Sequence, residues 1–188
     1  MDATRLSELT ARFGQCKVAV VGDFFLDKYL DFDPELAEVS VETGKTANQV
    51  ARVRHSPGAA GTVVSNLAAL GAARLLAVGF VGEDGEGWEL LRDLDSLGCD
   101  TSRMLVLPDR ATPTYLKPQN LRVPGLGGEA ERYDTKNRAP LPRAVEERLA
   151  ECLADAAGEV DADFCSESAD GHGVAASSSR STPSRRHL

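Results

Sequence analysis

Two carboxylates, Asp23 and Asp27, follow the first apolar run of the sequence. That run, 16–22 (Cys-Lys-Val-Ala-Val-Val-Gly), is continuously apolar, which is typical of a strand buried on both faces of a parallel sheet. Ligands of such sheets bind at the carboxyl edge, where a carboxylate can accept charge-assisted hydrogen bonds from two sugar hydroxyls. The same two residues would serve equally well as turn and cap residues without a ligand, so their spacing alone leaves both interpretations open.

Two further segments are rich in small residues at the start of a helical pattern. The first, 57–62 (Pro-Gly-Ala-Ala-Gly-Thr), would let a ligand approach backbone amides, but it would also allow close packing against a strand. The second, 82–87 (Gly-Glu-Asp-Gly-Glu-Gly), superficially resembles a dinucleotide-binding pattern, yet its acidic residues would repel a pyrophosphate. We interpret it as a strand-to-helix turn with Asp84 as the N-cap.

The sequence offers no pattern for a metal site or a nucleophilic triad. The three histidines and four cysteines share no metal-ligand spacing, and no Ser-His-Asp set can be assembled. The scattered cysteines, without a Cys-x-x-Cys pair, are expected to be reduced thiols. Trp88, the only tryptophan, opens a leucine-bearing helical segment and is expected in the core.

Apolar periodicity predicts alternating strands and helices that would position these segments. Strands are predicted at 16–23, 74–81 and 104–107, and helices at 3–14, 57–71, 88–97 and 142–157. Gly71 and Gly98 follow two of the helices, where a C-cap belongs. This alternation with short glycine-rich connections predicts an α/β, doubly wound and mainly parallel sheet with right-handed crossovers.

Other stretches depart from this alternation. Residues 31–56 are charged and alternate weakly, which favours extended edge strands or a loop excursion away from the sheet. Further strands are expected at 112–117, 120–123 and 131–134. Val160 should lead into another strand of the main sheet. However, the sequence from 163 to 188 is low in complexity and has few apolar side chains to bury, so it is predicted to be disordered.

Composition narrows the class of protein. With 188 residues, 42% hydrophobic and 27% charged, the chain is neither a membrane protein nor wholly disordered. The net charge of -8 argues against a nucleic-acid or anionic-membrane partner. No run reaches signal-peptide length or the roughly 18 apolar residues of a membrane span, so the cytoplasm is the expected compartment. The charge is uneven, because residues 171–188 contain three arginines and no acidic residue.

Taken together, these segments resemble the N-terminal half of a PfkB-type, ribokinase-like carbohydrate kinase. The segments that carry the resemblance are 20–29, 57–71 and 81–87. Two more, 110–118 and 131–138, look most like the heptose 7-phosphate kinase branch, which occurs in ADP-heptose synthases. The resemblance covers residues 16 to about 162, and the order and spacing of its segments make it specific.

The resemblance implies a sugar site. By that resemblance Asp27 would bind substrate hydroxyls, the backbone at Gly58, Ala59 and Thr62 would line the same pocket, and Lys117 would reach toward a phosphate or sugar oxygen. Thr62 departs from the family pattern, which often has an asparagine whose amide touches the substrate. The sugar specificity is therefore open.

The resemblance also implies a small β-sheet lid over the sugar, with lid strands within 31–53 and 112–123. A lid of this kind could join two copies of the chain in a homodimer. A Rossmann oxidoreductase domain is disfavoured, because Gly22-Asp23-Phe24 stands where a Gly-x-Gly-x-x-Gly should follow the first strand.

The family's C-terminal half has no counterpart in the sequence. In these kinases that half carries the ATP site and a Gly-Ala-Gly-Asp motif, whose amides hold the transferring phosphoryl group and whose Asp is the base. Nothing like it follows Asp134, so no catalytic residue is assigned, and ATP and Mg²⁺ are implied only for the family. We therefore expect residues 1–162 to be the N-terminal part of a kinase domain, truncated before the C-terminal half and inactive alone, with a frameshifted tail at 163–188. The alternative is a non-catalytic sugar-binding or dimerisation module.

Overall fold

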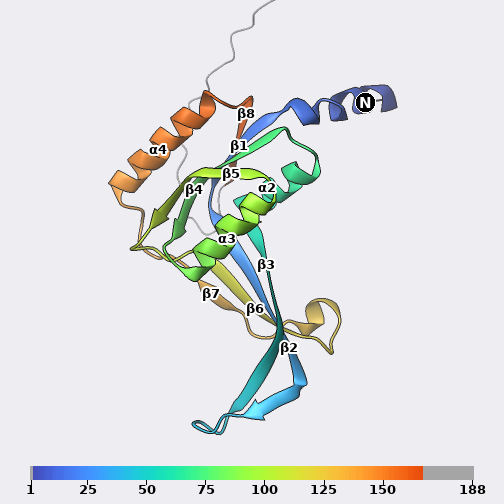
Figure 1. Cartoon of the computed structure of the whole chain (residues 1–188), viewed down its shortest axis with the longest axis vertical. Helices are drawn as coiled ribbons and strands as arrows, with labels where there is room; N and C mark the ends of the chain where they lie inside the picture. Colours follow the sequence, from blue (N-terminus) through green and yellow to red (C-terminus); the bar gives the residue numbers. More distant parts are fainter. Residues whose placement is uncertain (1, 167–188) are drawn as a thin grey trace, which may run out of the picture.

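Four apolar segments form an all-parallel sheet in a computed structural model that describes residues 2–166 (Figure 1). The strands are β1 (Lys17–Gly22), β4 (Arg74–Gly82), β5 (Cys99–Leu107) and β8 (Ala162–Ser166), in the order β5-β4-β1-β8. The strand order confirms the predicted α/β fold with a parallel sheet. The strand β5 begins five residues before the predicted 104–107, and its first residue, Cys99, is buried.

Helices cover both faces of this parallel sheet. Helices α2 (Ala60–Ala69) and α3 (Gly85–Ser96) pack on one face, and α4 (Arg143–Ala157) packs on the other. Side chains alternate between the faces along each strand, so Val20 of β1 lies in the core with α2 and α3, while Ala19 and Val21 face α4. This two-sided burial explains the continuous apolar run in the sequence.

The second sheet, called here the lid sheet, contains both parallel and antiparallel strand pairs. It consists of β2 (Phe24–Val39), β3 (Thr46–Ala59), β6 (Thr114–Asn120) and β7 (Tyr133–Thr135), in the order β3-β2-β6-β7. The strand β2 pairs antiparallel with β3 and parallel with β6. Figure 1 shows the β2–β3 hairpin reaching well beyond the parallel sheet. The predicted excursion is thus a pair of long strands.

The residues that connect the two sheets differ from the sequence-based expectation. Residues 57–59 end strand β3 instead of opening a helix, and α2 begins only at Ala60. Similarly, residues 121–123 follow β6 as a turn rather than as a strand. The prediction for Trp88 is wrong: this side chain is 63% exposed, and the guanidinium of Arg92 lies 4.8 Å from the centroid of its ring.

The glycine signals at the helix ends are confirmed. Gly71 and Gly98 adopt φ angles of 79° and 74°, directly after the C-cap residues of α2 and α3. Left-handed backbone of this kind is readily adopted only by glycine, which is why these two helices end where the sequence indicates.

The ends of the described chain carry small elements. Helix α1 (Ala3–Thr10) buries no residue, and two short 3₁₀ turns, η1 (Phe13–Gln15) and η2 (Gly125–Gly128), lie in connections. The boundary expected at 162/163 falls inside β8, which pairs with β1 through Ser166. The disorder predicted for the rest of the tail concerns residues 167–188, which lie outside the described residues. Within residues 2–166 no helix is long and apolar enough to cross a membrane.

Candidate functional site

Asp27 lies within the lid strand β2, and not in a turn after β1, which was one of the two interpretations that the sequence left open. The three residues before it, Phe24 to Leu26, are buried and extend the chain straight into the lid sheet. Asp23 alone occupies the connection between β1 and β2, and its carbonyl accepts the amide of Ala60 at 3.0 Å. The carboxylate of interest is therefore held by a strand, which is a more rigid support than a loop.

Strand register brings Lys117 to Asp27. Asp27 is aligned with Tyr115 of β6, and Tyr29 with Lys117. Because side chains alternate along a strand, these four residues share one face of the lid sheet, called here the Asp27 face. The Nζ of Lys117 lies 2.6 Å from Oδ1 of Asp27, with both side chains mostly buried. Two residues that the family resemblance assigned to one site thus form an ion pair.

Two aromatic rings surround the Lys117 ammonium. Its Nζ donates to the Tyr29 hydroxyl at 3.4 Å and lies 5.0 Å and 5.9 Å from the ring centroids of Tyr29 and Tyr115. Burial alone would lower the pKa of Lys117, but the hydrogen bond and charge of Asp27 outweigh it and raise that pKa. Lys117 is therefore a cation at neutral pH, and its ammonium group could bind an anionic or hydroxyl-bearing ligand.

Gly58 lies beside Asp27 at the end of strand β3, and Ala59 is the last residue of that strand. A Cβ built on Gly58 would lie 2.8 Å from Oδ2 of Asp27, so only glycine leaves room for this carboxylate. Ala59 has φ 50° and ψ -116°, a conformation that residues with a side chain rarely adopt. In the strand pairing Gly58 is aligned with Phe25, which shares the face of Asp27, whereas Ala59 is aligned with Phe24, which lies on the opposite face.

The Thr62 side chain contacts the backbone of the β3–α2 connection and not Asp27. Its hydroxyl donates to the carbonyl of Pro57 at 3.4 Å and so helps to close the turn from β3 to α2. Its side chain lies on the exposed surface of the first turn of α2. The structure thus brings together Asp27, Gly58 and Lys117, whereas it does not bring Ala59 or Thr62 into contact with Asp27.

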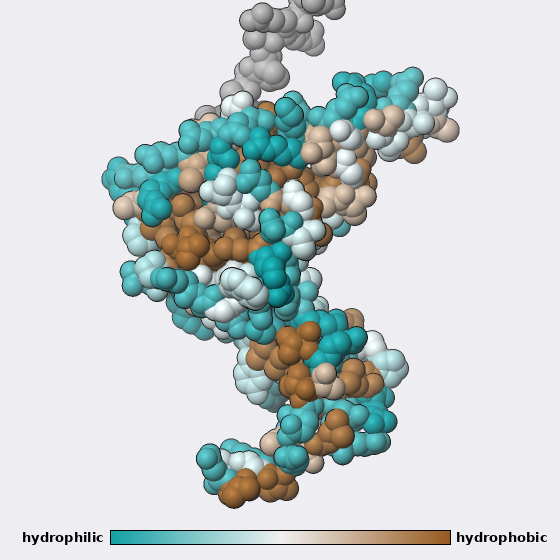
Figure 2. Space-filling view, viewed as in Figure 1, coloured by the Kyte–Doolittle hydropathy of each residue, from teal (hydrophilic) through white to brown (hydrophobic). Residues whose placement is uncertain are grey.

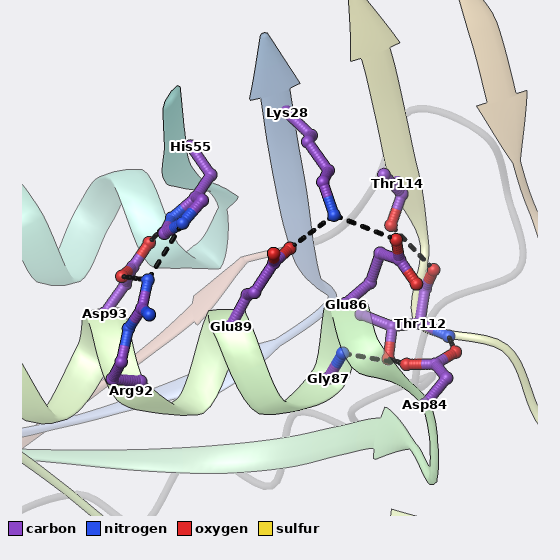
Figure 3. A network of polar contacts seen from close by, with 10 residues as sticks. All are labelled: Lys28, His55, Asp84, Glu86, Gly87, Glu89, Arg92, Asp93, Thr112 and Thr114. Atoms are coloured by element: carbon purple, nitrogen blue, oxygen red, sulfur yellow. Dashed lines mark hydrogen bonds and ion pairs between the residues drawn. The ribbon is translucent and has the colours of Figure 1, made fainter. Parts of the chain in front are cut away.

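The opposite face of the lid sheet is attached to α3 by charged contacts (Figure 3). The Nζ of Lys28 pairs with Glu86 at 3.1 Å and with Glu89 at 2.7 Å. His55, aligned with Lys28 on β3, pairs through Nδ1 with Asp93, while its Nε2 lies 2.8 Å from Arg92 Nη2. A guanidinium can only donate, so Nε2 accepts and Nδ1 donates. These contacts fix the base of the hairpin against the parallel sheet domain.

Asp84 connects the other lid strand to the same helix. Its Oδ1 accepts the amide of Gly87 at 2.7 Å, which confirms the predicted N-cap of α3. Its carboxylate also accepts the amide and hydroxyl of Thr112, at 2.8 and 2.7 Å. Thr112 is fully buried just before β6, and its hydroxyl accepts the amide of Gly82. Through Asp84, the turn at 82–87 therefore connects α3 to Thr112 before β6, and Thr112 in turn contacts the end of β4. Figure 3 shows the contacts of Asp84 with Gly87 and Thr112.

Sequence reasoning missed several residues of the Asp27 face. Asp31 is fully buried and pairs with Arg52 and Arg54, and Arg54 also lies 4.7 Å from the centroid of the Tyr29 ring. The alternation of Asp27, Tyr29 and Asp31 along β2 is a period-two signal for one strand face. It could have been read only once the strand had been assigned.

The described residues do not provide a metal centre. Among residues 2–166 there is no group of three or more His, Cys, Asp or Glu side chains that could hold a metal ion. The Mg²⁺ implied for the family therefore has no such ligand group on this part of the chain.

Comparison with known proteins agrees with this architecture. The sequence profile described as "pfkB family carbohydrate kinase" matches residues 17–120, which is more than half of the chain. Curated relatives include the "Bifunctional protein HldE" of Trichlorobacter lovleyi, 32% identical over 149 residues, and that of Magnetococcus marinus, 39% identical over 136 residues. These alignments cover 79% and 72% of this chain but only 29% and 26% of the relatives, so the chain spans less than a third of their length.

Solved structures share the fold. A carbohydrate kinase from Agrobacterium tumefaciens superposes with a TM-score of 0.52 at 14% identity, covering 80% of this chain and 45% of that one. A second solved structure, that of Sa239, also gives a TM-score of 0.52, at 18% identity, covering 80% of this chain and 45% of that one. With its ribokinase-like fold, its lid sheet and the matching profile over 17–120, this chain belongs to the pfkB family of carbohydrate kinases.

Proposed function

We propose that this chain is the sugar-binding half of an ATP-dependent kinase that phosphorylates a sugar phosphate of the heptose 7-phosphate type. The observation that carries the proposal is the Asp27–Lys117 pair on the Asp27 face, with a nitrogen-to-oxygen distance of 2.6 Å. Asp27 offers a carboxylate to sugar hydroxyls, and Lys117 offers an ammonium to sugar or phosphate oxygens. The resemblance to "Bifunctional protein HldE" supports the heptose phosphate as the leading substrate.

The pair is suited to sugar binding because it is mostly buried yet not closed off. The side chains of Asp27 and Lys117 are 21% and 15% exposed, so a ligand could reach both groups while displacing little water. Tyr29 and Tyr115 beside Lys117 add ring surface of the kind that packs against the apolar face of a sugar. Gly58 keeps the backbone of β3 close to the carboxylate, so the sugar would meet a narrow and defined surface.

We further propose that the chain alone does not transfer a phosphoryl group. Phosphoryl transfer depends on positioning and charge stabilisation around the nucleotide, and the family's Gly-Ala-Gly-Asp motif does not occur after Asp134. ATP and Mg²⁺ are thus assigned to the C-terminal half of the kinase, and the described residues contribute the acceptor side. The cytoplasm remains the compartment that the sequence predicts.

Calorimetric titration of the full chain tests the sugar site. A heptose 7-phosphate should bind, and Asp27→Asn should weaken binding by about tenfold or more, because a charged hydrogen-bond acceptor is lost. Asp33→Asn is the matched control, since Asp33 also lies on β2 and pairs with a basic residue, Arg122, at 2.7 Å. Binding that survives Asp27→Asn unchanged would refute the assigned site. ADP formation from ATP and the sugar phosphate above background would refute inactivity.

The alternative, a dimerisation module, is favoured by the apolar surface of the hairpin. Exposed apolar side chains gather on β2, β3 and their connection: Leu36, Val39, Val41, Val50 and Val53 (Figure 2). Burial of these side chains between two copies of the lid sheet would stabilise a homodimer. Light scattering should then give a dimer mass that Val39→Lys with Val50→Lys reduces to a monomer, whereas Leu126→Lys, outside the hairpin, does not. A monomeric wild-type chain would contradict this homodimer.

A further inference from the structure

Arg54 adds a second cation to the Asp27 face. Arg54 of β3 is aligned with Tyr29 of β2, and its guanidinium carbon lies 4.7 Å from the centroid of that ring. The Nζ of Lys117 lies 5.0 Å from the same centroid. One aromatic ring therefore spaces two cations on the face that also carries Asp27.

Asp31 holds Arg54 in a fixed orientation. Its two carboxylate oxygens accept Nε and Nη2 of Arg54, each at 2.8 Å, and Oδ2 also accepts Nε of Arg52 at 2.8 Å. The Asp31 side chain is fully buried, while that of Arg54 remains 43% exposed. A two-pronged contact of this kind fixes the plane of the guanidinium and leaves Nη1 directed away from Asp31.

The stability of the Asp31 anion makes this support permanent over the ordinary pH range. The hydrogen bond from Arg54, helped by Arg52, lowers the pKa of Asp31 to about 2 against the opposing effect of burial. Asp31 therefore stays ionised, and Arg54 keeps its orientation whether or not a ligand is present. A donor that is already oriented loses little side-chain entropy when it binds an anion.

Charge on this face is opposite to that of the whole chain. The chain carries -8, yet around Tyr29 the cations Arg52, Arg54 and Lys117 outnumber the carboxylates of Asp27 and Asp31. Around the neighbouring Tyr115 ring lie two more cations, Arg132 and Lys136, with the carboxylates of Asp134 and Glu129 acting on Arg132. A local positive excess on an acidic protein favours an anionic ligand at this place.

Resting on the proposed function, we propose that Arg54 binds the phosphate group of the sugar phosphate substrate, while Asp27 binds its hydroxyls and Lys117 lies between the two. Arg54 presents N–H groups in the fork geometry that suits phosphate oxygens, whereas the Asp27 end offers a carboxylate that suits hydroxyls. Asp31 is a positioning residue, because it orients Arg54 without touching the ligand. The residues thus discriminate a sugar phosphate from a free sugar.

The test compares four probes on the full chain: a heptose 7-phosphate, the unphosphorylated heptose, inorganic phosphate and ATP. Arg54→Gln should weaken heptose 7-phosphate binding about tenfold or more, which is the usual effect of losing a charged hydrogen bond, and change heptose binding less than twofold. Arg122→Gln is the matched control, because Arg122 forms the same two-pronged contact with Asp33 on the same sheet, at 3.0 and 2.7 Å. Thermal unfolding of each variant reports whether the fold is kept.

Asp31→Asn provides the test of positioning. This variant should show a weaker preference for the phosphorylated sugar while still binding heptose. Arg54→Lys should keep more of the wild-type preference than Arg54→Gln but not all of it, because an ammonium lacks the planar fork of N–H groups. If Asp31→Asn does not fold, Arg54→Gln alone still decides the assignment, since Arg54 is partly exposed.

Each outcome bears on the inference. Equal losses for heptose and its phosphate, no loss in Arg54→Gln, or an equal loss in Arg122→Gln would overturn it while leaving the sugar site intact. Loss confined to ATP or inorganic phosphate would assign Arg54 to a different phosphate and would also overturn it. Absence of binding by either sugar would overturn the proposed function, and the inference with it.

Discussion

Gly58 of β3 lies directly against the carboxylate of Asp27 on β2, so closely that a Cβ on Gly58 would stand 2.8 Å from Oδ2. The next nearest atoms, Cγ of Asp27 and Cβ of Phe25, would be at 3.5 Å, which is ordinary contact. A side chain at Gly58 would therefore displace the Asp27 carboxylate and little else. A substitution at Gly58 can therefore change the position of the Asp27 carboxylate without changing the stability of the fold.

Gly58→Ala should weaken binding of the sugar phosphate by about tenfold while changing the unfolding midpoint little, because only the Asp27 carboxylate has to move. Titration calorimetry and thermal unfolding on the same variant measure the two effects. Gly85→Ala is the control, since a Cβ there meets nothing within 4 Å. Unchanged affinity in Gly58→Ala would show that the position of Asp27 does not limit binding.

Ala59 occupies a strained conformation, with φ 50° and ψ -116°. Ala59→Gly should raise the free energy of unfolding by about 1 kcal/mol, because glycine adopts this conformation without steric cost. Urea unfolding checks the change. The matched Ala154→Gly, at an exposed position inside α4, should lower it by about 1 kcal/mol. Destabilisation by both variants would argue against strain at Ala59.

Asp84 supports three donors at the start of α3. Asp84→Ala should lower the free energy of unfolding by about 2 kcal/mol or more, because the amides of Gly87 and Thr112 lose their acceptor in a partly buried place. Asp2→Ala removes a comparable N-cap contact, to the Arg5 amide at 2.7 Å, from a helix that buries no residue. Its effect should be well under 1 kcal/mol in the same urea titration, and equal effects would contradict a special function for Asp84.

Asp31 should make the protein sensitive to acid. Its pKa falls from 3.8 to about 2 on folding, so its contribution to stability is complete above 3.8 and is lost as the pH falls toward 2. Asp31→Asn should therefore show a shallower loss of unfolding free energy between these two pH values than the wild-type chain. Glu151→Gln, at an exposed position on α4, should keep the wild-type slope. Parallel slopes for Asp31→Asn and wild type would disprove the linkage.

The sequence was sufficient for features that depend on local chemistry. The apolar run of β1 predicted a central parallel strand because a strand buried on both faces has no polar positions. Asp84 was identified as an N-cap, and Gly71 and Gly98 as helix ends, because capping needs only the residue types of one turn. Asp27, Gly58 and Lys117 came from the family resemblance, and the structure brings them into contact.

The contacts themselves depended on the tertiary structure. Asp27 and Lys117 are far apart in the sequence, and only the parallel pairing of β2 with β6 places them on one face at 2.6 Å. The exposure of Trp88 and the burial of Asp31 likewise follow from which face of an element meets a neighbour, because residue type fixes a preference for burial but not the partner. The sequence alone thus determined most of the parallel strands, the caps and the family, whereas strand register decided which charges face one another and which cations lie beside Asp27.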